Sequence, residues 1–171
     1  MMSKQRTRRG ATLAVLAAAA LLVGLTVPAA ASDFQFDLPA GLACPSFDLR
    51  VAGVVVGPQN SHEFTDDDDN VVWALSAGRG NDLEFTNLSS GASLSLEATG
   101  SVNRTVFNPD GSQTVTVTGM TVLIMFPTDM PAGPSTTLHV GRVVYGVDSS
   151  GTFTIRSTSG RAIDICAALT D

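Results

Sequence analysis

Residues 101–126 read SVNRTVFNPDGSQTVTVTGMTVLIMF, and this stretch decides the fold that the sequence predicts. Its two halves alternate apolar and other residues with a period of two, which is the period of a β-strand. Between the halves lies Asn108-Pro109-Asp110-Gly111. Proline presets φ for the second position of a turn and glycine accepts positive φ, so the stretch is predicted to form a β-hairpin.

The second strand of this hairpin changes its apolar parity partway along. Its alternating apolar residues are first the odd-numbered Val115 and Val117, and then the even-numbered Met120, Val122, Ile124 and Phe126. Because side chains alternate between the two faces of a strand, such a switch would turn one apolar set toward water unless the strand bends or bulges. Gly119 lies at the switch. We therefore predict a β-bulge or a sharp bend at Gly119, with the strand passing from one part of a core to another.

The end of the same strand, Val122–Phe126, is apolar on both faces. This pattern favours a well-buried central strand whose end is covered on both sides. Two alternatives stay open from the residues. The strand end could line a barrel interior that holds a small apolar ligand, or it could form a surface for a partner.

The first 31 residues have the pattern of a secretory signal peptide. Lys4 and three arginines form a basic start, residues 11–27 are uncharged and largely apolar, and Ala29-Ala30-Ala31 is typical of a cleavage site. We expect a secreted, extracellular protein with no membrane span after cleavage. An uncleaved anchor is the alternative, and Arg8-Arg9 leaves the twin-arginine export route open beside the general secretory route.

The remaining chain, residues 32–171, is predicted to be one strongly acidic β-domain. The leader holds four of the ten basic residues and none of the sixteen acidic ones, so the rest of the chain carries a formal net charge of −10 and no lysine. Such a surface repels polyanions and offers no basic patch to bind them. Nucleic acid and anionic membranes are therefore not expected as partners.

Cys44 and Cys166, near the two ends of this domain, are its two cysteines. In an exported chain an even pair of cysteines favours a disulfide, which we predict here. Two free buried thiols, or a bridge between two chains, are the alternatives.

The rest of the sequence is a series of short apolar runs separated by turn signals, with no convincing helical periodicity. About nine to eleven short strands with mostly tight links predict an all-β fold, a single antiparallel meander domain that forms a β-barrel or a β-sandwich. Residues 127–135, PTDMPAGPS, contain three prolines. We expect them to form an exposed, stiff loop where the chain crosses to another sheet or opens into a barrel mouth.

Several motifs spread over most of the domain carry a resemblance to a known group of proteins. The motifs are Asn108-Pro109-Asp110-Gly111, Phe126-Pro127-Thr128-Asp129 with Pro131-Ala132-Gly133-Pro134, Gly141-Arg142-Val143-Val144, and Asp164-Ile165-Cys166-Ala167-Ala168-Leu169. Through them the chain resembles uncharacterised, exported all-β proteins of actinobacteria. The resemblance implies an exported β-domain and brings no known activity, substrate or catalytic residue.

The acidic run DDDDN is the best candidate for a metal site. Asp66, Asp68 and Asn70 have the alternate spacing with which a calcium loop directs oxygens at one cation. The glycine and glutamate that such a loop carries at its sixth and twelfth positions are replaced by Val71 and Ala77. We therefore assign no metal site, keep these three residues as a weak Ca²⁺ candidate, and expect the solvated tip of a hairpin.

The sequence contains no catalytic signature, and no G-x-S-x-G motif for a serine nucleophile. His62 and His139 have the chemistry of a general base or a metal ligand, but with both cysteines oxidised they do not make a convincing zinc site. We expect structural or surface roles for both histidines, no catalytic residue and no cofactor. A small extracellular hydrolase that uses His62 or His139 with nearby carboxylates is the alternative.

These observations favour a secreted, monomeric, non-enzymatic β-domain that binds an extracellular ligand or protein, or contributes to the cell envelope. The binding residues are not identified. Rigid β-scaffolds display function on loops, so residues 127–135 and 66–70 are the first places to look. One tryptophan, Trp73, and one tyrosine, Tyr145, do not supply the aromatic platforms usual in carbohydrate-binding sandwiches.

Overall fold

The computed structural model of the protein describes residues 33–170. The predicted signal peptide, residues 1–31, lies outside the described residues. Within them no helix has the length and hydropathy needed to cross a bilayer. The described elements are β1 (Phe34–Leu38), β2 (Leu49–Val55), β3 (Gln59–Thr65), β4 (Val71–Gly78), β5 (Asn81–Asn87), β6 (Ser93–Leu96), β7 (Ser101–Phe107), β8 (Gln113–Met125), β9 (Ser135–Val147), β10 (Phe153–Asp164) and α1 (Ile165–Ala168).

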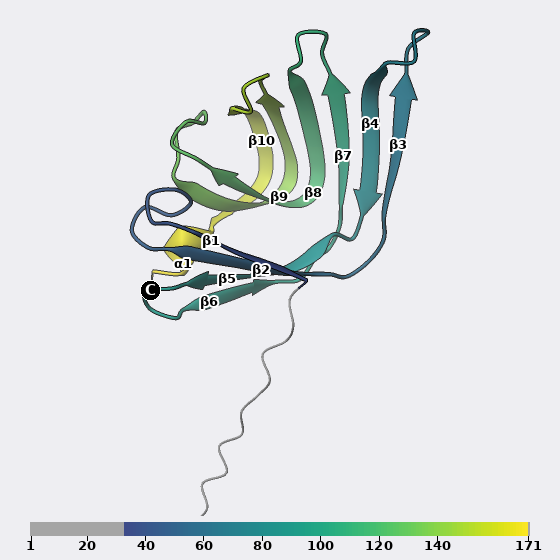
Figure 1. The fold of residues 1–171 in the computed structure, drawn as a ribbon. Helices are drawn as coiled ribbons and strands as arrows, with labels where there is room; N and C mark the ends of the chain where they lie inside the picture. Colours follow the sequence, from purple (N-terminus) through teal and green to yellow (C-terminus); the bar gives the residue numbers. More distant parts are fainter. Residues whose placement is uncertain (1–32, 171) are drawn as a thin grey trace, which may run out of the picture. The chain divides into compact units, whose positions relative to one another are not determined.

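The strands form two antiparallel sheets (Figure 1). Sheet A has the order β1-β2-β5-β6, and sheet B has the order β10-β9-β8-β7-β4-β3. Along the chain, β1 and β2 belong to sheet A, β3 and β4 to sheet B, β5 and β6 to sheet A, and β7 to β10 to sheet B. Each sheet has two edge strands. The predicted all-β, antiparallel fold is therefore confirmed, in the form of a sandwich rather than a barrel. An uninterrupted meander is found in the last four strands, β7 to β10.

The central hairpin forms where the sequence predicts it. β7 and β8 pair from Ser101 opposite Gly119 to Phe107 opposite Gln113. In the turn between them Gly111 has a φ of 80°, and the backbone N–H of Asn108 donates to the carbonyl oxygen of Ser112 at 2.9 Å. Glycine tolerates this left-handed conformation, so the prediction of the turn from its proline and glycine is confirmed.

Three glycines in one row bend sheet B. Gly119 of β8 lies opposite Gly141 of β9, which lies opposite Gly160 of β10. Their φ angles are 119°, 145° and 98°, and a Cβ at any of them would run into the backbone of a neighbouring strand. The β8–β9 register continues through the row without a shift. The predicted bend at Gly119 is confirmed, as a glycine kink shared by three strands and not as a bulge.

Beyond the bend, β8 is covered on both faces. Val122 and Ile124 pack against the main core, which lies between sheet A and the bent part of sheet B. Leu123 and Met125 turn to the other face and form a second cluster with Val143 of β9. The prediction that both faces of this strand end are covered is therefore confirmed for residues 122–125, whereas Phe126 belongs to neither cluster. The predicted central position is wrong, because beyond Gly119 β8 pairs with β9 and no longer with β7. Because the strands of the described residues form two open sheets, they enclose no barrel interior that could hold an apolar ligand at this strand end.

The main core contains the predicted disulfide. Cys44 and Cys166 are bonded, with their Cα atoms 5.5 Å apart, and both are buried. The bond joins the segment before β2 to α1 and indicates an oxidising, non-cytoplasmic environment. The core residues that surround it are Ala43, Phe47, Leu49, Val51, Phe85, Leu138, Ile165 and Leu169.

The proline-rich loop does not cross between sheets, so that expectation is wrong. It joins β8 to β9, which are hydrogen-bonded neighbours over their whole lengths. The loop is also fixed to the start of β10. Met130 donates its backbone N–H to Phe153 and accepts from Ile155, at 2.8 and 2.7 Å. The buried carboxylate of Asp129 accepts from the backbone N–H groups of Phe126 and Phe153, at 2.7 and 2.9 Å. These bonds hold the loop beside the second cluster.

The glycine row gives a first prediction. Gly141→Ala should lower the free energy of unfolding by about 1–3 kcal/mol more than Gly151→Ala, as measured by urea unfolding. Both glycines have positive φ, so both variants carry the strain of a left-handed residue, about 1–2 kcal/mol. A Cβ at Gly151 meets nothing within 4 Å, whereas one at Gly141 meets the carbonyl oxygen of Ser159. Equal losses in the two variants would show that the close approach of strands at the row is unimportant.

The disulfide gives a second prediction. The bond closes a loop with a sequence separation of 122 residues, so replacing both cysteines in Cys44→Ala/Cys166→Ala should cost about 2–5 kcal/mol of stability. In a thermal melt, reductant should lower the Tm of the wild type and leave the Tm of the double variant unchanged. The stabilising role of the disulfide would be contradicted if reductant left the Tm of the wild type unchanged and the double variant were as stable as the wild type.

Candidate binding site

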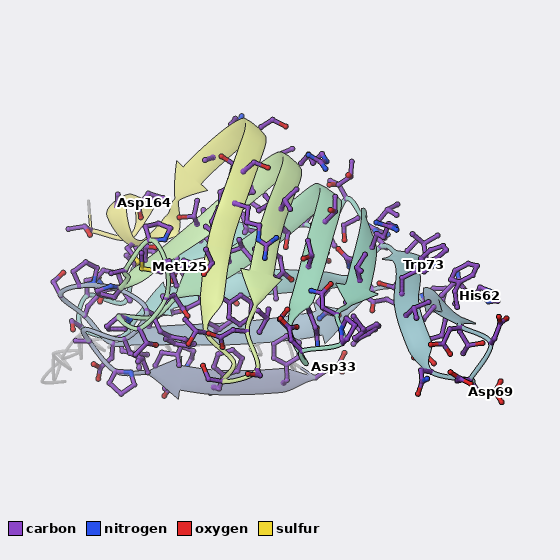
Figure 2. All side chains as sticks on the ribbon, turned by 90° about the horizontal axis from the view of Figure 1, so that it is seen from above. Asp33, His62, Asp69, Trp73, Met125 and Asp164 are labelled. Carbon is purple, nitrogen blue, oxygen red and sulfur yellow. A yellow bond between two sulfur atoms is a disulfide. The ribbon has the colours of Figure 1, made fainter. Side chains whose placement is uncertain are left out.

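The hairpin of β3 and β4, residues 59–78, forms an arm at one end of sheet B. β3 is hydrogen-bonded to β4, and β4 to β7 on its other side. None of the arm's side chains belongs to the main core or to the second cluster. Figure 2 shows Trp73, His62 and Asp69 together on this arm, on the opposite side of the domain from Met125 and Asp164. The arm therefore has to be stabilised by contacts of its own.

Those contacts are a row of stacked side chains across the outer face of sheet B. The rings of Phe64 and Trp73, a cross-strand pair, lie 3.5 Å apart between centroids with 8° between their planes. The His62 and Phe64 rings are arranged edge to face with their centroids 4.6 Å apart, and the Arg104 guanidinium lies 5.2 Å from the Trp73 ring centroid. Phe64 and Arg104 come from the strands on either side of β4. The indole is therefore held between them and is not an open platform for a sugar ring.

Two exposed aliphatic residues continue this row into a patch. Leu75 pairs across the sheet with both His62 and Arg104, and Val102 lies two residues before Arg104 on β7, on the same face. Their side chains are 37% and 45% exposed. We call the set of His62, Phe64, Trp73, Leu75, Val102 and Arg104 the arm patch. It joins aromatic, aliphatic and guanidinium groups on one open sheet face.

The arm patch was not predicted from the sequence. The spacing of His62 with Phe64 and of Trp73 with Leu75 is the available signal, because alternate residues share a face. On β4, however, Val72 and Ala74 on the opposite face are also apolar, so the sequence of the strand does not show which of its two faces is exposed. The cross-strand partner β7, which supplies Arg104, is identified by the structure alone.

The acidic run forms the tip of the arm, as predicted. The Asp66 carboxylate accepts from the backbone N–H groups of Asp68 and Asn70, both at 2.9 Å, and from the Asn70 side chain at 3.3 Å. The bond from the Asn70 backbone is the main cause that holds the pKa of Asp66 below its ordinary value. Within residues 33–170 no group of three or more His, Cys, Asp or Glu side chains is placed to hold a metal ion. The weak Ca²⁺ candidate of Asp66, Asp68 and Asn70 stays a prediction.

The structure separates the two histidines. His62 is exposed on the arm, whereas His139 is 8% exposed on β9, opposite Thr121 of β8 and Ala162 of β10. Burial lowers the pKa of His139, so its neutral form is favoured in the folded protein. Among the described residues neither histidine forms an ion pair with a carboxylate. The arrangement therefore gives no support to a hydrolase built on either histidine.

The two loops that the sequence offers as binding elements are also far apart. Figure 2 shows Met125, the last residue of β8 and two residues before the proline-rich loop, across the domain from Asp69 at the arm's tip. The structure does not bring residues 127–135 and 66–70 into one site. Of the two, the acidic tip lies beside the arm patch.

Comparison with known proteins does not name this site. The chain matches no protein-family model, no curated protein and no solved structure. The resemblance to exported proteins of actinobacteria stays a prediction. The arm patch has to be interpreted from its own chemistry.

The stacked row gives a third prediction, by a double-mutant cycle. The variants Phe64→Leu, Trp73→Leu and their combination should show a coupling energy of about 0.5–1.5 kcal/mol in urea unfolding, because stacked rings contribute beyond their buried area. As a control, Phe64→Leu combined with Phe153→Leu, which lies beside the second cluster, should be additive within about 0.5 kcal/mol. A zero coupling between Phe64 and Trp73 would mean that the arm does not depend on the stack.

Proposed function

We propose that this protein is an exported, non-catalytic binding domain that docks a partner protein on the arm patch. The observation that carries the proposal is the patch itself, an aromatic and aliphatic face of sheet B that belongs to neither hydrophobic cluster. Exposed apolar surface of this kind marks interaction sites when it is contiguous and rimmed by polar groups.

The residue types of the patch are those that contribute most to protein–protein binding. Tryptophan, other aromatic residues and arginine are enriched at interface cores, and a few of them supply most of the binding energy. Trp73 and Arg104 lie at the centre of the patch and are held by the stack before a partner arrives. Side chains that are already ordered lose little further entropy on binding, which favours affinity.

The acidic tip adds a preference for partner charge. Four aspartates, Asp66–Asp69, extend from the strands that carry Phe64 and Trp73, and all four are exposed. A carboxylate cluster at the rim of an interface raises the rate of association with a basic partner and disfavours an acidic one. The proposed partner is therefore a protein with an apolar docking surface and basic residues at its border.

Two further observations support export of a binding domain. The Cys44–Cys166 disulfide indicates an oxidising environment, and the predicted signal peptide at residues 1–31 supplies a route to one. Among residues 33–170 no histidine forms an ion pair with a carboxylate, so no specific observation favours the alternative of a hydrolase. We propose a monomer without a cofactor that acts outside the cytoplasm.

Site-specific photo-crosslinking tests this proposal. A photo-reactive residue at position 75, on the arm patch, should capture a protein from the envelope or culture medium of the producing cells, and the same residue at position 95 should not. Ser95 is an exposed residue of β6 on sheet A and is the matched control. The captured protein is then purified and its Kd for the domain is measured.

The measured affinity decides the outcome. Leu75→Asp should weaken binding at least about tenfold, because a charge in the centre of an apolar interface loses its hydration. Ser95→Asp should leave the Kd unchanged, and thermal melts of both variants establish that they are folded. Equal crosslinking from positions 75 and 95, or an unchanged Kd for Leu75→Asp, would overturn the assignment of the arm patch.

A further inference from the structure

An open cleft lies where sheet A meets the bend of sheet B, and it is separate from the arm patch. Its volume is about 170 Å³. The link between β4 and β5 forms one wall, the link between β6 and β7 forms another, and β8 just beyond Gly119 supplies the third. The glycine row therefore shapes the cleft, because the bend turns β8 across the end of sheet A.

The inner part of the cleft is apolar. Leu83, Met120 and Val122 line it, and all three also pack against the main core. Ala98, which is 7% exposed, adds a methyl group to the same wall. An apolar group that enters the cleft would replace water on these surfaces, and this contributes favourably to binding.

The outer part of the cleft is polar and contains a guanidinium. Arg79 is exposed, and its Nε donates to the carbonyl oxygen of Ala98 at 3.1 Å, which fixes the planar group at the cleft. Arginine has five N–H donors, so this bond leaves the four on its terminal nitrogens to bind a ligand. Among the described residues one ion pair is formed, between Arg50 and Asp37, and Arg79 takes no part in it. Asp82, the nearest carboxylate in sequence, accepts from the backbone N–H of Ala98 at 2.7 Å.

The volume limits the size of the ligand. A protein cavity of about 150 Å³ holds one benzene molecule, whereas sites for larger organic ligands occupy about 300–1,000 Å³. The cleft therefore fits a ligand of roughly six to nine non-hydrogen atoms by the same comparison. A guanidinium binds a carboxylate through two parallel hydrogen bonds, and the apolar wall suits a short hydrocarbon group.

We propose that this cleft binds a small carboxylate with a short apolar tail, with the carboxylate on Arg79 and the tail against Leu83, Met120 and Val122. Benzoate and isovalerate have this chemistry and size. The ligand would be held by one fixed cation and one apolar wall. For so small a ligand the affinity should be modest, with a Kd on the order of 1 mM.

Nuclear magnetic resonance titration of the ¹⁵N-labelled protein tests the proposal, with benzoate as probe and benzamide as a neutral molecule of the same shape. Benzoate should shift the amide signals of Gly80, Gly100 and Thr121, which line the cleft. Benzamide should shift them far less. The absence of shifts at 20-fold the expected Kd, about 20 mM, would overturn the proposal.

Two variants and one control locate the site. Arg79→Gln should weaken benzoate binding at least tenfold, while Arg142→Gln, an exposed arginine elsewhere on sheet B, should leave it unchanged. Thr99→Phe places a ring in the cleft from an exposed link position and should abolish the shifts without loss of Arg79. Binding that persists in either Arg79→Gln or Thr99→Phe, or that benzamide reproduces, would overturn the assignment.

Discussion

The structure depends on the close approach of three backbones at Gly119, Gly141 and Gly160. β8 and β9 have thirteen residues each, which is about 43 Å of extended strand, whereas β2 has seven, or about 23 Å. Without the bend, nearly half of each long strand would extend past sheet A with an apolar face in water. The glycine row instead folds sheet B back on itself. The part of β8 beyond the row packs on sheet A through the main core, and its opposite face packs on the part of sheet B before the row through the second cluster. A side chain at these positions would hold the strands apart, because the neighbouring backbone occupies the space of a Cβ.

Much of this arrangement can be predicted from the sequence, because the signals are local. The change of parity around Gly119 predicts the bend, and Asn108-Pro109-Asp110-Gly111 predicts the turn, since both depend on residues adjacent in the chain. The pairing of Cys44 with Cys166 follows from there being two cysteines in the chain. The role of Gly141 and Gly160 in the bend, in contrast, depends on their lying opposite Gly119 and each other in neighbouring strands. The alternation of residues along one strand does not predict this cross-strand register. The proline-rich loop was misinterpreted for the same reason, because it joins neighbouring strands that the sequence does not identify as neighbours.

The two candidate sites were harder to predict than the fold because each is assembled from distant parts of the chain. The stack places a residue of β7, Arg104, over Trp73 of β4. The cleft combines a link residue, Arg79, with Met120 from beyond the bend. Single histidines and acidic runs are visible in a sequence, but the hydrogen bonds of the Asp66 carboxylate and the burial of His139 are visible in the fold alone. The sequence indicates which groups lie close together within one strand or turn, whereas both candidate sites are formed by residues of different strands and links.

The position of the disulfide has a mechanical consequence. Cys44 and Cys166 enclose all of sheet B up to α1 and three of the four strands of sheet A within one covalent ring. Tension that enters the chain before Cys44 and leaves it after Cys166 passes through the sulfur–sulfur bond and loads none of the strands between them. β1, which precedes Cys44 and pairs with β2 alone, is the one strand that such tension would peel away. A domain with this bond can be stretched between two attachment points while its bent sheet and arm keep their shape.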